Sequence, residues 1–225
     1  MFFTDLKDPI YGLALLMVDI FTKYCAVIPL KTNKIHDVAV AIEEGIQKMG
    51  GKPKSIYSDN EGAFVSNELQ KYFKDNNIRH ITTLSHAPVA ERTIRTIKAM
   101  IYKRVEKTGE KWHEVLGAVL LTYNRKLVHS STKFTPVEAM KPENHLDVKL
   151  NLELRAKHTR KYPEVKVGDY VKVYRKKDKL DKERLSLWSK DRFKVVDIVE
   201  SMGQPFYKLE GRPKLVQRSE ILLVN

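Results

Sequence analysis

Two apolar runs near the beginning of the chain, residues 11–20 and 24–30, are separated only by the short turn FTK. Both runs are rich in aliphatic residues, which predicts two strands. A turn this short joins antiparallel neighbours, because a parallel pair needs a long crossover connection. The stretch MFFTDL, residues 1–6, predicts a further short strand before them. The chain is therefore expected to begin with three strands whose neighbours run antiparallel.

Helices and strands alternate beyond these three strands. Aliphatic residues recur at helical spacing over residues 37–49, and the pair Gly50-Gly51 then ends the predicted helix. The same patterns predict strands at 54–58 and 79–83 and helices at 67–76, 88–107 and 110–126. Three early strands followed by this alternation predict an α/β fold, with a mixed sheet and helices on both of its faces.

The last third of the chain has a different pattern. Residues 141–164 contain two prolines and many charges but no long apolar period, which indicates a linker with room for a short helical piece. Short alternating stretches then predict strands at 169–175, 193–199, 206–209, 215–217 and 221–224. Five short strands favour a small all-β barrel. The predicted organisation is a core at 1–140, a linker at 141–164 and a barrel at 165–225.

The chain is basic, with 41 Lys and Arg against 28 Asp and Glu. The excess is uneven, since residues 1–150 have a net charge of +5 and residues 151–225 have +8. Such an excess favours a polyanionic partner, most often nucleic acid. Cys25 is the one cysteine, which excludes an internal disulfide and a zinc site built on paired cysteines. The longest apolar stretch, YGLALLMV, is too short to span a bilayer, so we expect a soluble intracellular protein.

Three carboxylates stand where a sheet and a helix can bring them together. Asp5 and Asp59 end predicted strands, and Glu91 begins the longest predicted helix. Without cysteine or histidine partners, they would form an oxygen-rich site that suits magnesium or manganese. Two such ions, about 3.5–4 Å apart, activate a water or hydroxyl at a phosphodiester. Spacing alone leaves an alternative equally open: a surface charge, a turn residue and an acid favoured by the helix dipole.

The longest predicted helix carries two different stripes. One is aliphatic and suits the core: Ile94, Ile97, Ile101 and Val105. The other places a carboxylate, two cations and an aromatic ring on one face: Glu91, Arg95, Lys98 and Tyr102. The second stripe is either a solvated surface with a weak Glu–Arg pair or a face that grips phosphates and stacks on a base.

Four stretches together resemble the core of retroviral-type integrases: MFFTDL, LLMVDIFTKYCAVIPL, YSDNEGAF and SHAPVAERTIRTIK. The likeness is greatest to the integrases of Maverick/Polinton DNA transposons and their viral relatives. The run SSTKFTPVEAM resembles the segment after that core in retrotransposon integrases. KVGDYVKVY, FKVVDIV and FYKLEG resemble their C-terminal barrel of the Src-homology-3 or chromodomain type. The resemblance therefore implies a ribonuclease H-like core followed by a small barrel.

The resemblance also implies a function, namely that of a DDE-type DNA integrase of a mobile element or virus. Asp5, Asp59 and Glu91 would be its catalytic residues and the ligands of two Mg²⁺ or Mn²⁺ ions. Such polynucleotidyl transferases trim element ends, join their 3′-hydroxyls to target DNA, work as multimers and act in the nucleus of a host cell. Two other functions remain open: a ribonuclease H-like nuclease without strand transfer, and a domesticated, non-catalytic DNA-binding protein.

The sequence departs from the family pattern in three respects. Glu61 stands where Gly is more usual, and 31 residues separate Asp59 from Glu91, somewhat fewer than in retroviral integrases. The family's N-terminal His/Cys zinc module has no counterpart here, as expected of a fragment.

The predicted DNA contacts come from the long helix and from the basic C-terminal part. They are Arg92, Arg95, Lys98, Tyr102, Lys172, Arg175, Lys176, Lys177 and Lys190. The C-terminal contacts should be to phosphates, with little base preference. Tyr170, Tyr174 and Trp188 are expected to be barrel core and surface; the alternative is an aromatic cage for methylated lysine, which would allow chromatin contact.

Asp5 and Asp19 compete for the first catalytic position. Asp19 also follows an apolar strand, but in the integrases that this chain resembles the catalytic Asp lies on the first strand. If the first two strands run antiparallel, the end of the first lies beside the start of the second, far from Asp19. Pairing of the first strand with the strand that ends at Asp59 would bring Asp5 to that site. We therefore predict Asp5 as the ligand.

Overall fold

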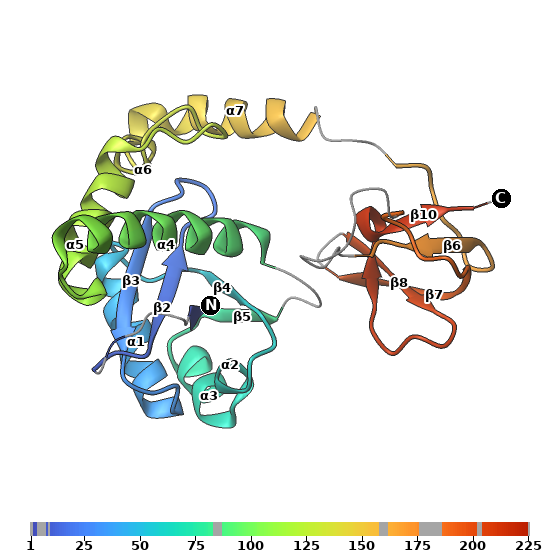
Figure 1. Ribbon diagram of the computed structural model, residues 1–225, viewed down its shortest axis with the longest axis horizontal. Helices are drawn as coiled ribbons and strands as arrows, with labels where there is room; N and C mark the ends of the chain where they lie inside the picture. The colour runs from blue at the N-terminus through green and yellow to red at the C-terminus, as the bar shows by residue number, and fades with distance from the viewer. Residues whose placement is uncertain are drawn as a thin grey trace. The chain divides into compact units, whose positions relative to one another are not determined.

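The computed structural model describes residues 2–3, 8, 10–82, 87–157, 162–175, 186–201 and 204–224. The chain forms two compact units, Met1–Thr159 and Arg160–Asn225 (Figure 1). Each unit has a buried apolar core of its own. Within the described residues, no helix combines the length and the apolar character that crossing a membrane requires.

The N-terminal unit is built around an antiparallel hairpin. Strands β2 (Leu13–Val18) and β3 (Cys25–Leu30) pair along their whole length. Strand β1 (Phe2–Phe3) pairs antiparallel with β2 and places Phe3 opposite Ala14, at the start of β2. The prediction of three early strands with antiparallel neighbours is confirmed.

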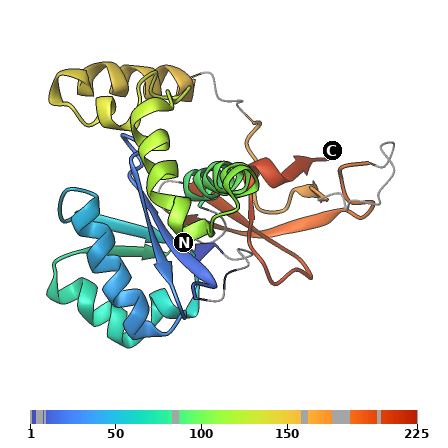
Figure 2. The same ribbon diagram turned by 60° about the vertical axis from the view of Figure 1, so that its left-hand side comes forward.

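Helices cover both faces of this hairpin. Successive side chains of a strand point to opposite faces, so β2 divides its apolar residues between two cores. Leu16 packs in one cluster with α4 (Pro88–Thr108) and α5 (Trp112–Lys126), whereas Leu15 packs in another with α1 (Ile35–Lys48). Figure 2 shows the blue strands between these two groups of helices. The predicted helices on both faces are confirmed.

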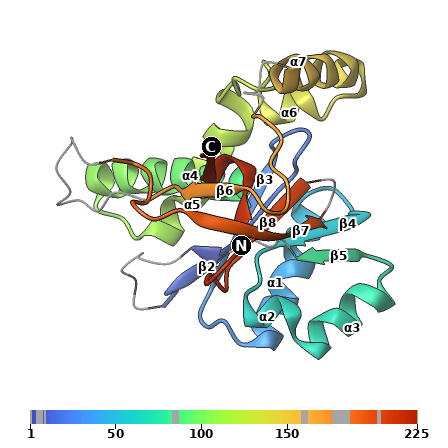
Figure 3. The same ribbon diagram turned by 90° about the vertical axis from the view of Figure 1, so that its right-hand side faces the viewer.

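A parallel pair of strands completes the N-terminal unit. Strand β4 (Ser55–Ser58) pairs with β5 (Arg79–Thr82), and the crossover between them contains α2 (Gly62–Val65) and α3 (Asn67–Asp75) (Figure 3). The unit thus contains both antiparallel and parallel strands. In the described part of the chain, however, β1 pairs only with β2, and β4–β5 is a sheet of its own.

Glycines in the left-handed conformation follow two of the helices, and the pair Gly50-Gly51 was predicted to end the first of them. Gly50 follows α1 with φ of 85° and Gly109 follows α4 with φ of 71°, conformations that strain any residue with a side chain. Three short helical elements follow α5: α6 (Pro136–Ala139), η1 (Pro142–Asn144) and α7 (His145–Lys157). The segment predicted as a linker therefore contains the 13-residue helix α7. The predicted domain boundaries themselves stay predictions.

The C-terminal unit is an antiparallel sheet with the strand order β10-β6-β7-β8-β9. Its strands are β6 (Tyr170–Val173), β7 (Phe193–Ser201), β8 (Gln204–Leu209), β9 (Val216–Gln217) and β10 (Ile221–Leu223). The single turn η2 (Arg218–Glu220) joins β9 to β10, and no pairing between these two edge strands closes the described sheet. The five predicted strands are present, but the predicted closed barrel is not confirmed.

Candidate active site

Asp59 follows the last residue of β4. Ser58 is 2% exposed, and the Oδ1 atom of Asp59 is also buried, with no hydrogen-bond donor among the described residues. A buried carboxylate oxygen without a partner costs free energy, and proteins rarely tolerate one unless water, an ion or a ligand completes it. Asp59 therefore presents an oxygen suited to a group that the described chain does not supply.

Glu91 lies in the first turn of α4. Pro88 begins the helix, and the backbone N–H of Glu91 donates to the carbonyl of Ala87 at 2.9 Å. Ile97 and Ile101 are each 0% exposed. Their burial orients α4 and confirms the predicted aliphatic stripe.

The other predicted stripe of α4 faces outward. Arg95 and Tyr102 are exposed, while Glu91 and Lys98 are half-buried. Arg92, one position after Glu91, is exposed as well. This arrangement suits both a solvated surface and a face that contacts phosphates, so the predicted DNA contacts stay predictions.

The predicted metal-binding triad cannot be assembled from the described residues. Asp5 lies outside them, and among the others no three His, Cys, Asp or Glu side chains gather as a metal site. Asp59 and Glu91 are hard oxygen donors, the type that Mg²⁺ and Mn²⁺ prefer. The unpartnered oxygen of Asp59 is the observation that fits a cation. The catalytic assignment of Asp5, Asp59 and Glu91 stays a prediction.

Asp19, the competing acid, has a structural role in the β2–β3 turn. Its Oδ1 accepts hydrogen bonds from the backbone N–H and the hydroxyl of Thr22, each at 2.6 Å. Its own backbone N–H donates to the carbonyl of Tyr24 at 2.8 Å. The Oδ1 atom thus already accepts two hydrogen bonds from one neighbouring residue, which favours a role in forming the turn over a role as a metal ligand.

A second carboxylate lies near Asp59. Burial raises the pKa of Glu61, and the negative charge of Asp59 raises it further. Two acids in one short loop make the local potential negative, which favours a cation there. In the sequence this residue stood out only as a departure from the family pattern.

Lys23 is the centre of a group of three cations from distant parts of the chain, because Arg92 and Arg155 each lie within its electrostatic reach. Burial lowers the pKa of Lys23; Asp19 raises it, and the positive charges of Arg155 and Arg92 lower it again. They come from the β2–β3 turn, α4 and α7. Sequence reasoning selected only Arg92, because no local pattern links residues so far apart.

Sequence reasoning also missed a network of hydrogen-bonded side chains that begins at Ser58, the residue before Asp59. It joins Ser58, His80 and Gln70 by hydrogen bonds of 2.7–2.8 Å. Its members come from β4, β5 and α3, and only the pairing of β4 with β5 brings them together.

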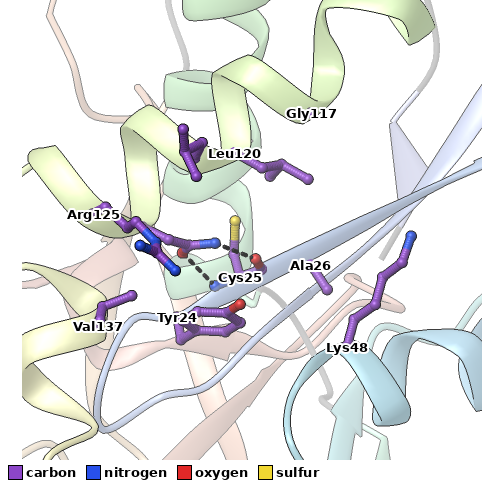
Figure 4. A pocket seen from close by; sticks show the side chains of 10 residues that line it. Tyr24, Cys25, Ala26, Lys48, Gly117, Leu120, Arg125 and Val137 are labelled. Carbon is purple, nitrogen blue, oxygen red and sulfur yellow. Dashed lines mark hydrogen bonds between the residues drawn. The ribbon is translucent and has the colours of Figure 1, made fainter.

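A hollow of ≈ 280 Å³ lies where β3 meets α5 (Figure 4). Within it, the backbone N–H of Cys25 donates to Asn124 Oδ1 at 3.0 Å, and Asn124 Nδ2 donates to the Cys25 carbonyl at 2.9 Å. Burial raises the pKa of the Cys25 thiol to about 12, which suits a core residue rather than a nucleophile. None of the predicted catalytic residues lines this hollow.

The C-terminal unit holds five of the predicted DNA contacts. Three are described: Lys172, Arg175 and Lys190. Two lie outside the described residues: Lys176 and Lys177. The rings of Tyr174 and Trp188 meet edge to face with centroids 5.9 Å apart, and Tyr170 is 50% exposed. A pair of rings is present, but an aromatic cage stays a prediction.

Residues 11–88 match the protein family described as the integrase core domain. The match includes β2 to β5 and Asp59 and ends at the first residue of α4. The Pol polyprotein of feline endogenous virus ECE1 is 34% identical over 126 residues, which are 53% of this chain and 12% of that polyprotein. The chain spans 59% or less of the length of curated relatives that it matches.

Solved structures also resemble the chain. The catalytic core domain of HTLV-2 integrase in complex with magnesium has a TM-score of 0.52 and 24% identity, covering 57% of this chain and 84% of that one. A chain of the simian T-cell lymphotropic virus intasome in complex with the PP2A regulatory subunit B56 gamma has a TM-score of 0.62 and 19% identity. This match covers 100% of the present chain and 78% of that one. At these identities the likeness shows the fold, which agrees with a ribonuclease H-like core. The family match over residues 11–88 and this fold agree with the resemblance to retroviral-type integrases.

Proposed function

We propose that the protein is a DNA integrase of a mobile element or virus, which trims the 3′ ends of element DNA and joins them to target DNA. The family match and the fold support an integrase core. The reaction itself, the substrates and a closer kinship with Maverick/Polinton integrases are parts of the proposal.

The observation that carries the proposal is the buried Oδ1 of Asp59 after the end of β4, which has no hydrogen-bond partner among the described residues. Asp5, Asp59 and Glu91 would hold two Mg²⁺ or Mn²⁺ ions. Ions bound there would activate a water or a 3′-hydroxyl and stabilise the leaving oxygen of the phosphodiester. The chain contributes the carboxylates and their positions, so neither a nucleophilic cysteine nor a covalent protein intermediate is required.

The cations of the N-terminal unit would hold the DNA backbone beside these carboxylates. Arg92, Arg95 and Lys98 lie on the outward side of α4, next to Glu91. Lys23 adds a further cation within electrostatic reach of Arg92, and Arg155 lies within reach of Lys23. Phosphate contacts of this kind position DNA without reading its sequence. Tyr102, 48% exposed on the same helix, is placed to stack on a base.

The C-terminal unit would add weak DNA binding with little sequence preference. Residues 151–225 carry a net charge of +8, and Arg175 and Lys190 are exposed. Removing the unit should lower affinity and flatten its dependence on salt, because fewer counterions are released on binding.

Two assays on the full chain test the proposal. Nicking of supercoiled plasmid in Mg²⁺ or Mn²⁺ but not in EDTA would separate an enzyme from a DNA-binding protein. Joining of a 3′-hydroxyl oligonucleotide to the plasmid would separate an integrase from a nuclease. Nicking without joining would support the ribonuclease H-like nuclease, and binding without either would support the domesticated protein.

A charge-reversed variant tests the DNA-binding face. Arg95→Glu with Lys98→Glu should reduce DNA binding and joining while the thermal midpoint stays unchanged, since both residues lie on the outward face. The matched control is Lys103→Glu with Lys107→Glu, which makes the same charge change further along α4. Equal joining by the first variant and the wild type at ordinary salt would mean that the face is merely solvated.

A further inference from the structure

The loop that carries Asp59 is held at both of its ends by one chain of side-chain hydrogen bonds. At one end, the hydroxyl of Ser58 donates to the backbone carbonyl of Asp59 at 2.8 Å. At the other end, Gln70 Nε2 donates to the carbonyl of Phe64 at 2.7 Å. His80 lies between them, with Nε2 2.8 Å from Ser58 Oγ and Nδ1 2.7 Å from Gln70 Nε2.

The donors and acceptors of this chain can each be assigned. The Phe64 carbonyl can only accept, so the Gln70 atom facing it is the amide nitrogen, and that nitrogen also donates to His80 Nδ1. His80 is then neutral and carries its hydrogen on Nε2, which donates to Ser58 Oγ. The one hydroxyl hydrogen of Ser58 remains for the Asp59 carbonyl.

The surroundings of His80 favour this neutral ring. Its ring stacks on Phe73, with centroids 4.9 Å apart and planes 29° apart, and Phe73 is 1% exposed. Burial also lowers the pKa of His80. The imidazole is therefore held in one orientation and one tautomer.

Asp59 needs such support because its carboxylate has no other described anchor. Its Oδ1 accepts no hydrogen bond from the described residues, so its position depends on the backbone of the loop. We infer that Ser58, His80 and Gln70 form a positioning relay that holds the Asp59 backbone, and hence its carboxylate, in place for the proposed reaction. This inference rests on the proposed function for its catalytic consequence, but the relay itself is a property of the folded chain.

Four variants of the full chain test the relay. Ser58→Ala removes the hydroxyl and Ser58→Thr retains it, while Ser55→Ala makes the matched change at the other end of β4. His80→Phe keeps a ring to stack on Phe73 but removes both nitrogens. Loss of groups that orient metal ligands typically costs about 10–100-fold in activity. We expect Ser58→Ala and His80→Phe to slow Mg²⁺-dependent nicking by about 10-fold, with Ser58→Thr and Ser55→Ala close to the wild type.

A readout that does not depend on activity comes from nuclear magnetic resonance. In the wild type at pH 7, the ¹⁵N signals of His80 should show a neutral ring protonated on Nε2. Ser58→Ala should shift the backbone amides of residues 59–64, whereas Ser55→Ala should not. A His80 protonated on Nδ1, or folded Ser58→Ala and His80→Phe proteins that nick at the wild-type rate, would overturn the relay. If the wild type does not nick at all, the proposed function fails, and the His80 tautomer and the loop amides alone decide the relay.

Discussion

Two strands of the N-terminal unit are each followed by an aspartate, but the two acids have different surroundings. Asp19 follows β2, and its Oδ1 accepts two hydrogen bonds from Thr22, each of 2.6 Å. Asp59 follows β4, and its Oδ1 is buried without a donor among the residues that the structure describes. An acid after a strand therefore serves the fold where its own turn supplies donors, and it is a candidate ligand where the turn supplies none.

The connection after each strand explains the difference. β2 and β3 are antiparallel, so the chain turns back at once and places Thr22 against Asp19. β4 and β5 are parallel, so the chain leaves through α2 and α3. In α/β sheets, ligands bind outside the carboxyl ends of parallel strands, because the crossover leaves that edge open. Asp59 stands at such an edge.

The largest expected effect is the loss of one carboxylate at this edge. Asp59→Asn should lower metal-dependent joining by about 1,000-fold, since metal ions contribute several kcal/mol of charge stabilisation in the transition state. Its thermal midpoint should stay the same or rise, because the change removes the charge of a carboxylate whose buried oxygen has no donor among the described residues. Asp5→Asn should cause a similar loss of joining, with little loss of stability, if Asp5 is a second ligand of the same metal ions. Joining assays and thermal unfolding measure both effects; an active Asp59→Asn protein would refute the catalytic assignment.

Asp19 should show the opposite result. Asp19→Ala removes an acceptor of two hydrogen bonds, and we expect it to lower the free energy of unfolding by about 2 kcal/mol. Asp19→Asn should retain substantial joining activity. Denaturant unfolding and the joining assay are the measurements. The control is Thr22→Val, which removes the bonds of the hydroxyl to Asp19 and to the Tyr24 backbone N–H but keeps the backbone bond of residue 22 to Asp19, so its loss should be smaller. A folded Asp19→Asn protein without joining activity would shift the assignment from Asp5 to Asp19.

Acid pH should lower the free energy of unfolding of the N-terminal unit. Burial lowers the pKa of His80, and burial and then Lys23 lower the pKa of His129. Below the ordinary histidine pKa of about 6.5, the unfolded chain takes up protons that these folded-state rings do not. The stability that they contribute is thus fully present above about pH 6.5 and is lost as the pH falls through their lowered folded-state values. Unfolding free energies from pH 7.5 to 5 should decline less steeply in His80→Phe; identical slopes would contradict a neutral His80 whose pKa is lowered in the folded chain.

The smallest effect should come from the turn that Asp19 organises. Lys23→Met removes one cation near Arg92 and Arg155, so DNA affinity should fall only a few-fold and the salt dependence should lose about one unit of slope. Binding measured from 50 to 200 mM salt tests this. The control is Lys71→Met on α3, a residue that pairs with Asp75 at 2.9 Å. Equal slopes for Lys23→Met and the wild type would mean that this turn touches no phosphate.

Local patterns were sufficient for much of the fold. The aliphatic residues of β2 and β3 and the three-residue turn between them predicted a hairpin, because sequence neighbours joined so tightly have one way to pair. The stripe that contains Ile97 and Ile101 predicted the buried face of α4. In the C-terminal unit the strands were predicted but closure was not confirmed, because closure depends on a pairing between β9 and β10 that no local pattern specifies.

The order of strands and helices, the basic charge and the choice of Asp59 and Glu91 as candidate ligands came from the sequence by itself, since each rests on residues close together in the chain. Tertiary structure alone decided which acid is satisfied, because hydrogen-bond donors must reach an oxygen in space. It also decided that His80 and Gln70 are linked by hydrogen bonds to Ser58 and that Arg92 and Arg155 lie near Lys23. These groups come from different elements. The pairing of β4 with β5 brings Ser58, His80 and Gln70 into hydrogen-bond contact, and the fold of the N-terminal unit brings Arg92 and Arg155 within electrostatic reach of Lys23.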